Sequence, residues 1–135
     1  MPKDTFLPFG KGVFSNVISL HTLEHIYPLG EHLEEVRKVL KDGGRYSFVI
    51  PTEGGLSFWL GRQLFTKPHV KRNYGLDVNY IMDREHINDA NRVLKFLKMY
   101  FNITSYSFWP LKIPTLSFNA MIHGYVEKEA LPTSN

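Results

Sequence analysis

The chain has 135 residues, of which 43% are hydrophobic and 21% charged, and its formal net charge is +3. This length allows one domain, and the composition excludes a disordered, collagen-like or coiled-coil chain, while the small net charge argues against a nucleic-acid partner. The absence of Cys excludes disulfides, thiolate nucleophiles and Cys-based metal sites. No apolar run reaches the ~18 residues of a membrane span, so we expect a cytoplasmic protein with no membrane partner.

The first half of the chain predicts a strand, a helix and a second strand. Residues 13–20 end in a short apolar, partly β-branched run that is typical of a buried strand. Residues 29–41 predict a helix with an apolar face, early acidic residues and late basic residues, stopped by Asp42-Gly43-Gly44. Residues 45–50 predict the second strand. Such an order is typical of a βαβ unit with parallel strands.

The second half of the chain is more varied. Residues 56–65 predict a short apolar helix, and residues 66–82 a long irregular loop. That loop carries a small basic run, which is either a docking site for an anionic substrate or partner or a solvated face: Lys67, His69, Lys71 and Arg72. Residues 89–101 predict an amphipathic helix with Asn88 as its N-cap.

Two strands, 103–109 and 116–126, close the folded part of the chain. The proline-bounded stretch between them suits a hairpin-like turn, so we expect the pair to be antiparallel. The complete order predicts an α/β fold whose sheet is mostly parallel with an antiparallel edge. We expect one domain over residues 1–130, followed by a polar tail at 131–135.

Three segments, taken in order, resemble the C-terminal half of a class I S-adenosylmethionine-dependent methyltransferase of the type 11 kind. The first is residues 7–26, with a Leu-Pro-Phe loop, a strand and Leu23-Glu24-His25. The second is residues 35–45, which contain Arg37-Lys38-Val39-Leu40-Lys41-Asp42-Gly43-Gly44. The third begins at Arg84-Glu85-His86 and continues through the helix and strand up to residue 109. Order and spacing agree over about residues 4–126.

The resemblance implies a partial Rossmann-like methyltransferase fold whose last strand is antiparallel. The family's Gly-x-Gly-x-Gly turn and the acidic residue after its second strand have no counterpart here, since Gly10-Lys11-Gly12 precedes a strand. We therefore expect the family's N-terminal strands to be missing, in a fragment of a longer polypeptide or a truncated descendant. The strand at 17–20 would then be an exposed edge, covered by the missing half, a second copy or a different chain.

The resemblance also implies a cofactor, S-adenosylmethionine, and a small-molecule methyl acceptor. It places Ser19, Leu20 and His21 beside the cofactor, and Asp4 near the adenine amino group. Glu24 and His25 then face the cleft, and His86 lies on the acceptor side, where an imidazole suits general-base chemistry. Taken alone, His21, His25 and His86 have an alternative interpretation as residues that cap or pack against a neighbouring helix.

Residues 21–25 also spell H-x-x-E-H, which on a helix can place two zinc ligands beside an acidic base. The motif follows directly on a predicted strand, which disfavours this interpretation, and we predict no metal site. Three functions follow, in order of preference. The first is methyl transfer from S-adenosylmethionine by the C-terminal part of a methyltransferase. The second is a non-catalytic interaction module derived from that fold, and the third is a zinc hydrolase.

Overall fold

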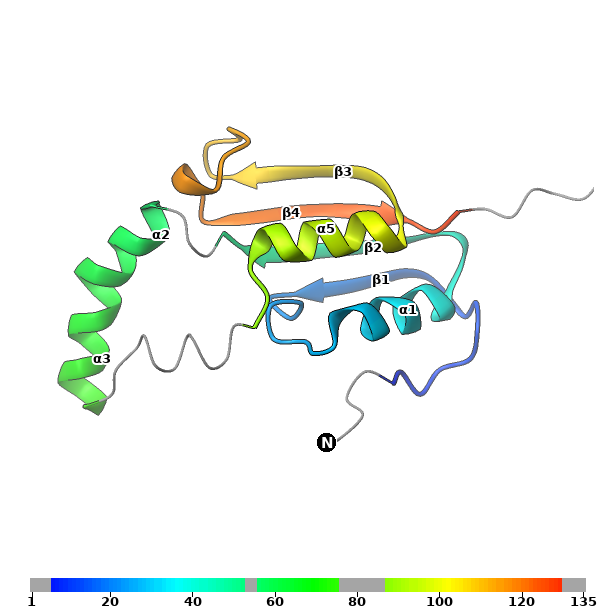
Figure 1. The fold of residues 1–135 in the computed structure, drawn as a ribbon, viewed down its shortest axis with the longest axis horizontal. Coiled ribbons are helices and arrows are strands. Elements are labelled where there is room, and N and C mark those ends of the chain that lie inside the picture. The colour runs from blue at the N-terminus through cyan, green and yellow to red at the C-terminus, as the bar shows by residue number, and fades with distance from the viewer. Residues whose placement is uncertain (1–5, 53–55, 76–86, 130–135) are drawn as a thin grey trace, which may run out of the picture.

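The computed structural model describes residues 6–52, 56–75 and 87–129. Within these ranges four strands form one sheet in the order β1-β2-β4-β3. The strands are β1 (Phe14–Leu20), β2 (Leu40–Pro51), β3 (Asn102–Trp109) and β4 (Met121–Glu127). Helices α1 (Leu29–Val39) and α5 (Ala90–Tyr100) lie over one face of the sheet, and a third helical run extends beyond one end of it (Figure 1).

The predicted βαβ unit is confirmed. Strands β1 and β2 are parallel, and Val17 lies opposite Tyr46. Helix α1 joins them and turns its apolar face inward, burying Leu29, Leu33, Val36 and Val39. Leu29, Leu33 and Val36 form one core with the inward face of α5 and the covered face of the sheet. Burial of these apolar residues is the main contribution to the stability of the unit.

The boundary between α1 and β2 lies earlier than predicted. The helix ends at Val39 and not at residue 41, because Leu40 already has extended backbone angles, φ −73° and ψ 139°. Residues 41–44 bulge from the start of β2, where its register with β1 is irregular. Gly43 has φ +73°, a conformation that glycine adopts readily, and its N–H donates to the Lys128 carbonyl at 3.0 Å. Gly43 therefore supports a bulge within a strand.

The last strand lies inside the sheet. β4 is antiparallel to both of its neighbours, β2 and β3, so the predicted antiparallel pairing of the last two strands is confirmed. This antiparallel pair lies at one edge of the sheet, as expected, with β3 as the edge strand and β4 as its interior neighbour. Residues 45–51 of β2 pair with residues 121–127 of β4, and that long-range contact holds β4 in the interior.

Strand β4 also begins later than predicted. Residues 116–120 were expected to be part of it, yet Leu116–Phe118 form a short 3-10 helix, η2. The buried side chain of Asn119 holds this loop together, because its Oδ1 accepts from the Leu111 N–H at 2.9 Å and its Nδ2 donates to two loop carbonyls at 2.8 Å. An amide that satisfies three backbone groups of one loop favours a compact turn over an extended strand.

The region after β2 contains more helix than predicted. The expected apolar helix at 56–65 is confirmed as α2 (Leu56–Gly61) and the π-helical η1 (Arg62–Thr66). The expected loop from residue 66 is wrong in its first part, since α3 (Lys67–Tyr74) continues the run. It ends at Gly75, which has φ +67° and donates its N–H to the Lys71 carbonyl at 3.1 Å. Residues 76–82 and the tail at 131–135 lie outside the described residues.

Helix α5 is confirmed, but its N-cap is Asp89 and not Asn88. The Asp89 carboxylate accepts a hydrogen bond from the Arg92 N–H at 2.8 Å, as an N-cap residue does. Asn88 is instead buried and has a different role, described below.

A half-buried histidine on α1 leads to a prediction about pH. Burial lowers the pKa of His32 below its ordinary value of 6.5. Between the lowered pKa of the folded state and about pH 6.5, His32 is protonated more in the unfolded chain than in the folded one. Unfolding free energy that is present above pH 6.5 is therefore lost as the pH falls through the folded-state pKa. We expect His32→Gln to reduce the loss of unfolding free energy between pH 7 and pH 5 in urea titrations. His69→Gln, at an exposed position on α3, is the control and should leave that loss unchanged.

Candidate functional site

The carboxyl end of β1 holds three of the predicted site residues. Ser19 and Leu20 point to opposite faces of the sheet, as neighbouring strand residues do. Ser19 lies on the helix-covered face, where the Tyr46 hydroxyl donates to its Oγ at 2.9 Å. Burial raises the pKa of Tyr46 to about 12, so this hydroxyl keeps its proton. Leu20 lies on the opposite face and is 63% exposed.

His21 turns the chain away from the sheet. Its φ of +48° is in the left-handed region, which is uncommon for a residue with a side chain. Its N–H still donates to the Val49 carbonyl of β2 at 3.0 Å, so the end of β1 remains anchored to the sheet. In open α/β sheets, ligands bind beyond the carboxyl ends of parallel strands, and His21 lies at such an end.

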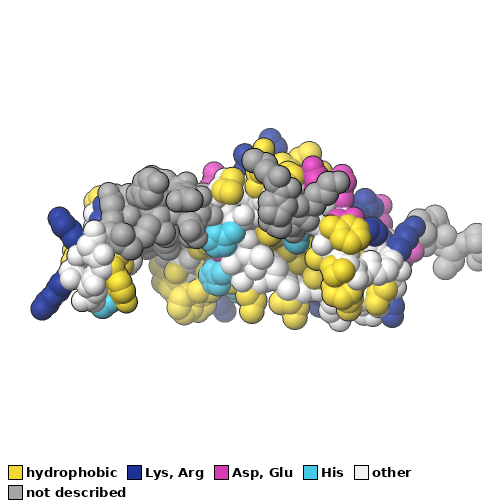
Figure 2. Space-filling model, turned by 90° about the horizontal axis from the view of Figure 1, so that it is seen from below, with side chains coloured by type: hydrophobic (Ala, Val, Ile, Leu, Met, Phe, Trp, Pro, Cys, Tyr) yellow, Lys and Arg dark blue, Asp and Glu magenta, His cyan; other side chains and the backbone are white. Residues whose placement is uncertain are grey.

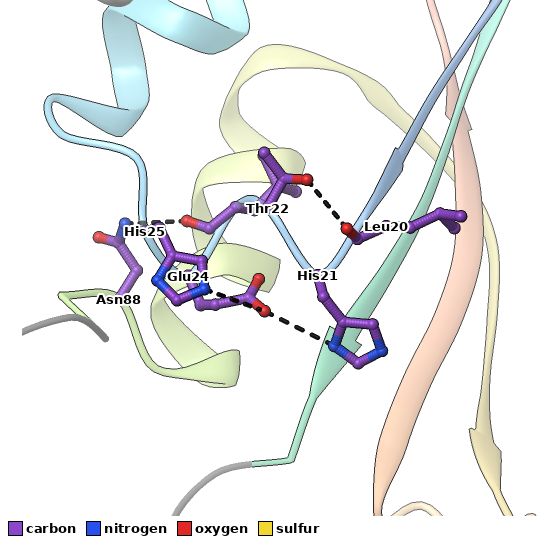
Figure 3. A network of polar contacts seen from close by, with 7 residues as sticks. Leu20, His21, Thr22, Glu24, His25 and Asn88 are labelled. Atoms are coloured by element: carbon purple, nitrogen blue, oxygen red, sulfur yellow. Dashed lines mark hydrogen bonds and ion pairs between the residues drawn. The ribbon is translucent and has the colours of Figure 1, made fainter. Parts of the chain in front are cut away.

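Glu24 is a buried carboxylate placed between two imidazoles. Its residue exposure is 2%, and its Oε1 lies 3.6 Å from Nδ1 of His21 and 3.9 Å from Nε2 of His25 (Figure 3). Its Oε2 is buried and has no hydrogen-bond partner among the described residues. Both histidine side chains are partly exposed. The turn therefore combines a desolvated acceptor with two groups that can exchange protons with a ligand.

Asn88 fixes this turn to the start of α5. Its Nδ2 donates to the carbonyls of Leu23 at 3.0 Å and Ile26 at 2.7 Å, and both Asn88 and Ile87 donate their backbone N–H groups to the Glu24 carbonyl. The Asn88 Oδ1 is buried and has no partner among the described residues. Four hydrogen bonds thus join two segments more than 60 residues apart.

The Asn88 contacts give a prediction about stability. Asn88→Ala removes both side-chain hydrogen bonds and leaves the Leu23 carbonyl buried and unpaired. We expect a loss of about 2–3 kcal/mol in unfolding free energy, measured by urea titration. The matched control is Asp89→Ala, which removes only the helix cap and should cost about 1 kcal/mol. Equal losses for the two variants would contradict the structural role assigned to Asn88.

The zinc-hydrolase alternative has no support in the geometry of residues 21–25. They follow β1 as a turn and form no helix, whereas the H-x-x-E-H motif needs both histidines on one helical face. Across ranges 6–52, 56–75 and 87–129, no cluster of three or more His, Asp or Glu residues is arranged to hold a metal ion.

Comparisons with known proteins agree with this geometry. The model of the methyltransferase domain family matches residues 3–48, a segment that contains β1, the turn at residues 21–25 (the Glu24 turn) and α1. No curated protein sequence matches the chain. A SAM-dependent methyltransferase of Methanosarcina mazei has a similar structure, with a TM-score of 0.59 and 17% identity, over 94% of this chain and 65% of that one. A protein of Pyrococcus horikoshii OT3 has a TM-score of 0.59 and 18% identity, over 93% of this chain and 56% of that one.

The described residues share the fold of one part of these structures, among them a SAM-dependent methyltransferase. The cyclase SpnF has the same architecture, with a TM-score of 0.61 and 14% identity, over 94% of this chain and 54% of that one. The chain therefore spans 54–65% of the length of these three structures. Because a cyclase is among them, the fold alone does not determine the reaction.

The structure places four of the predicted site residues at one end of the sheet. Ser19, Leu20, His21 and His25 lie around the carboxyl end of β1, and Ser19 faces the helices. Asp4 and His86 lie outside the described residues. Sequence reasoning noted Glu24 without recognising its burial, and it assigned Asn88 to a cap. Asp89, the residue after Asn88, is itself a favoured N-cap residue, and this could have indicated that Asn88 has a role other than capping.

Proposed function

We propose that this chain contributes one side of the active site of an S-adenosylmethionine-dependent methyltransferase that acts on a small molecule. The observation that carries the proposal is the Glu24 turn. It is a buried carboxylate between two histidines at the carboxyl end of a parallel strand, within the segment that matches the methyltransferase family. The interior antiparallel strand β4 and the similar structures support the same fold.

The residues of the turn fit one side of this cofactor. Glu24 Oε2 and Asn88 Oδ1 are buried acceptors without partners in the described part of the chain, and such atoms suit an ammonium or amino donor of a ligand. Exposed Leu20 offers an apolar surface for a ring. Ser19, Leu20 and His21 would line the cofactor, and Asp4 would accept from the adenine amino group. When bound, S-adenosylmethionine supplies an electrophilic methyl group on a sulfonium centre.

His25 is the proposed general base of this site. Its imidazole would take a proton from a hydroxyl or amine of the acceptor, and the nearby Glu24 carboxylate would orient the ring and stabilise its protonated form. His86 is proposed as a second base on the acceptor side. The residue that follows it, Ile87, donates its N–H to the Glu24 carbonyl at 2.9 Å. Alignment of the acceptor is the other contribution that the protein makes to the rate.

The exposed edge strand supports a second candidate, a non-catalytic interaction module. In the described part of the chain β1 pairs with β2 alone, and Ile18 and Leu20 are 67% and 63% exposed. An apolar, unpaired edge favours association. The proposed occupant is the N-terminal half of a methyltransferase fold or a second copy of this chain. A glycine-rich cofactor turn does not occur in the 135 residues, which favours a module that associates without catalysis.

Calorimetric titration of the 135-residue chain with S-adenosylhomocysteine tests the two candidates. A dissociation constant in the micromolar range, which corresponds to a binding free energy of about −8 kcal/mol, would support the enzyme proposal. An absence of binding up to millimolar ligand would overturn it for this chain alone. Light scattering after size-exclusion chromatography then tests the module. A dimer that Ile18→Lys converts to a monomer would support pairing through β1, and a monomer at all concentrations would contradict self-association.

A further inference from the structure

We propose that the helical run formed by α2, η1 and α3 docks on the surface of a membrane that contains anionic lipid. This inference is independent of methyl transfer. It departs from the expectation of no membrane partner, which rested on the lack of an apolar run long enough to span a bilayer. None of the helices in the described ranges has both the length and the hydropathy needed to cross a bilayer. The contact would therefore lie in the plane of the interface.

The net positive charge of the chain comes from this run. Residues 56–75 contain four Lys or Arg and no Asp or Glu, a formal charge of +4. The other 115 residues contain 12 Lys or Arg and 13 Asp or Glu, a formal charge of −1. Lys71 and Arg72 are exposed, and Arg62, Lys67, Lys71 and Arg72 form no ion pair with a carboxylate in the described part of the chain. A cluster of cations that has no acidic partner among the described residues is attracted to anionic headgroups.

Large apolar side chains are exposed on the same run. Phe65 is 74% exposed and Leu64 is 64% exposed, and Trp59 and Tyr74 are also exposed. The apolar residues lie mostly in the first half of the run and the cations mostly in the second half. Apolar and aromatic side chains next to cations are typical of helices that lie at a membrane interface, where the apolar groups enter the acyl boundary.

The run is placed so that a flat surface can reach it. It extends beyond the end of the sheet where β1, β2 and β3 have their carboxyl ends (Figure 1). Its packing against the rest of the described chain is chiefly between α2 and η2. Figure 2 shows dark-blue Lys and Arg side chains at this far end of the molecule, with yellow hydrophobic side chains beside them. Aliphatic side chains such as Leu64 have no evident role in binding a nucleic acid, which favours lipid over RNA.

Vesicle co-sedimentation of the full 135-residue chain tests the proposal. We expect binding to phosphatidylcholine vesicles that contain phosphatidylglycerol, much weaker binding to phosphatidylcholine alone, and weaker binding at high salt. The double variant Leu64→Ser/Phe65→Ser should weaken binding to the mixed vesicles by about tenfold or more. Lys71→Glu/Arg72→Glu should remove the preference for the anionic lipid.

Matched controls separate a local effect from a change in total charge or stability. Lys11→Glu/Lys95→Glu changes the net charge equally at exposed positions away from α3, and it should leave vesicle binding within about twofold. Circular dichroism should show that every variant is folded. Failure of the parent chain to bind anionic vesicles would overturn the proposal, and so would equal effects of the α3 and control variants. Binding of polyuridylate but not of vesicles would instead assign the surface to RNA.

Discussion

Alanine at position 124 should destabilise the sheet by about 3 kcal/mol or more, enough to unfold a marginal domain. Gly124 lies in the interior strand β4, between Phe48 of β2 and Tyr106 of β3. A Cβ atom there would lie 2.5 Å from the Tyr106 Cβ and still closer to the backbone carbonyl oxygen of Ser105. One of these atoms belongs to the backbone and the other is a Cβ atom, so neither can move by a side-chain rotation. The steric clash is relieved only if the pairing of β3 with β4 shifts. Urea titration of Gly124→Ala gives the measurement.

Gly61→Ala is the control for this prediction, with an effect of the opposite sign. Gly61 has helical backbone angles, and a Cβ atom there would meet no other atom within 4 Å. Alanine should raise the unfolding free energy by about 0.5–1 kcal/mol through the lower entropy of the unfolded chain. If Gly124→Ala unfolded at the same urea concentration as the parent protein, the close approach of β3 and β4 would be contradicted.

Glu24→Gln should weaken the binding of S-adenosylhomocysteine by about tenfold or more and leave the fold as stable as the parent or slightly more stable. The buried carboxylate has histidine nitrogens at 3.6 and 3.9 Å, and its second oxygen has no described partner. A desolvated charge that is incompletely paired costs folding free energy, and the amide keeps the volume without the charge. A loss of ligand affinity without a loss of stability is typical of a functional residue.

Two measurements on one set of variants decide the role of Glu24. Calorimetry gives the affinity, and urea titration gives the unfolding free energy. Glu34→Gln removes one negative charge from an exposed position of α1 and should change neither quantity by more than about 0.5 kcal/mol. If Glu24→Gln destabilised the fold and retained full affinity, the carboxylate would be structural. The proposed assignment of His25 as an oriented base would then lose its support.

The local elements of the fold could be predicted because short-range patterns determine them. The apolar spacing of α1 and α5 and the run at 17–20 produced elements within a few residues of those observed. The errors have long-range causes. The bulge at 41–44 depends on Lys128, and the loop at 111–119 depends on the buried amide of Asn119. The interior position of β4 depends on pairing with β2, which no local pattern encodes.

In the candidate site, too, the features that depend on local sequence could be predicted and those that depend on long-range contacts could not. The rule that ligands bind beyond the carboxyl ends of parallel strands predicted the neighbourhood of Leu20 and His21 from sequence. The burial of Glu24 and the clamp formed by Asn88 could not be predicted in the same way. Both arise from contacts between a turn near residue 24 and a segment more than 60 residues later. The helical α3 could have been predicted from Gly75, a common residue at helix ends.

The interior place of β4 has a consequence for the order in which the chain folds during synthesis. Strands β1 and β2 are complete once residue 51 has been made, and β3 follows at residue 109. The place between β2 and β3, however, is filled only when residues 121–127 form β4. Until that last segment leaves the ribosome, β2 and β3 both present open hydrogen-bonding edges. A nascent chain of this protein therefore depends on late closure, and a pause in translation before residue 121 would prolong its exposure to aggregation.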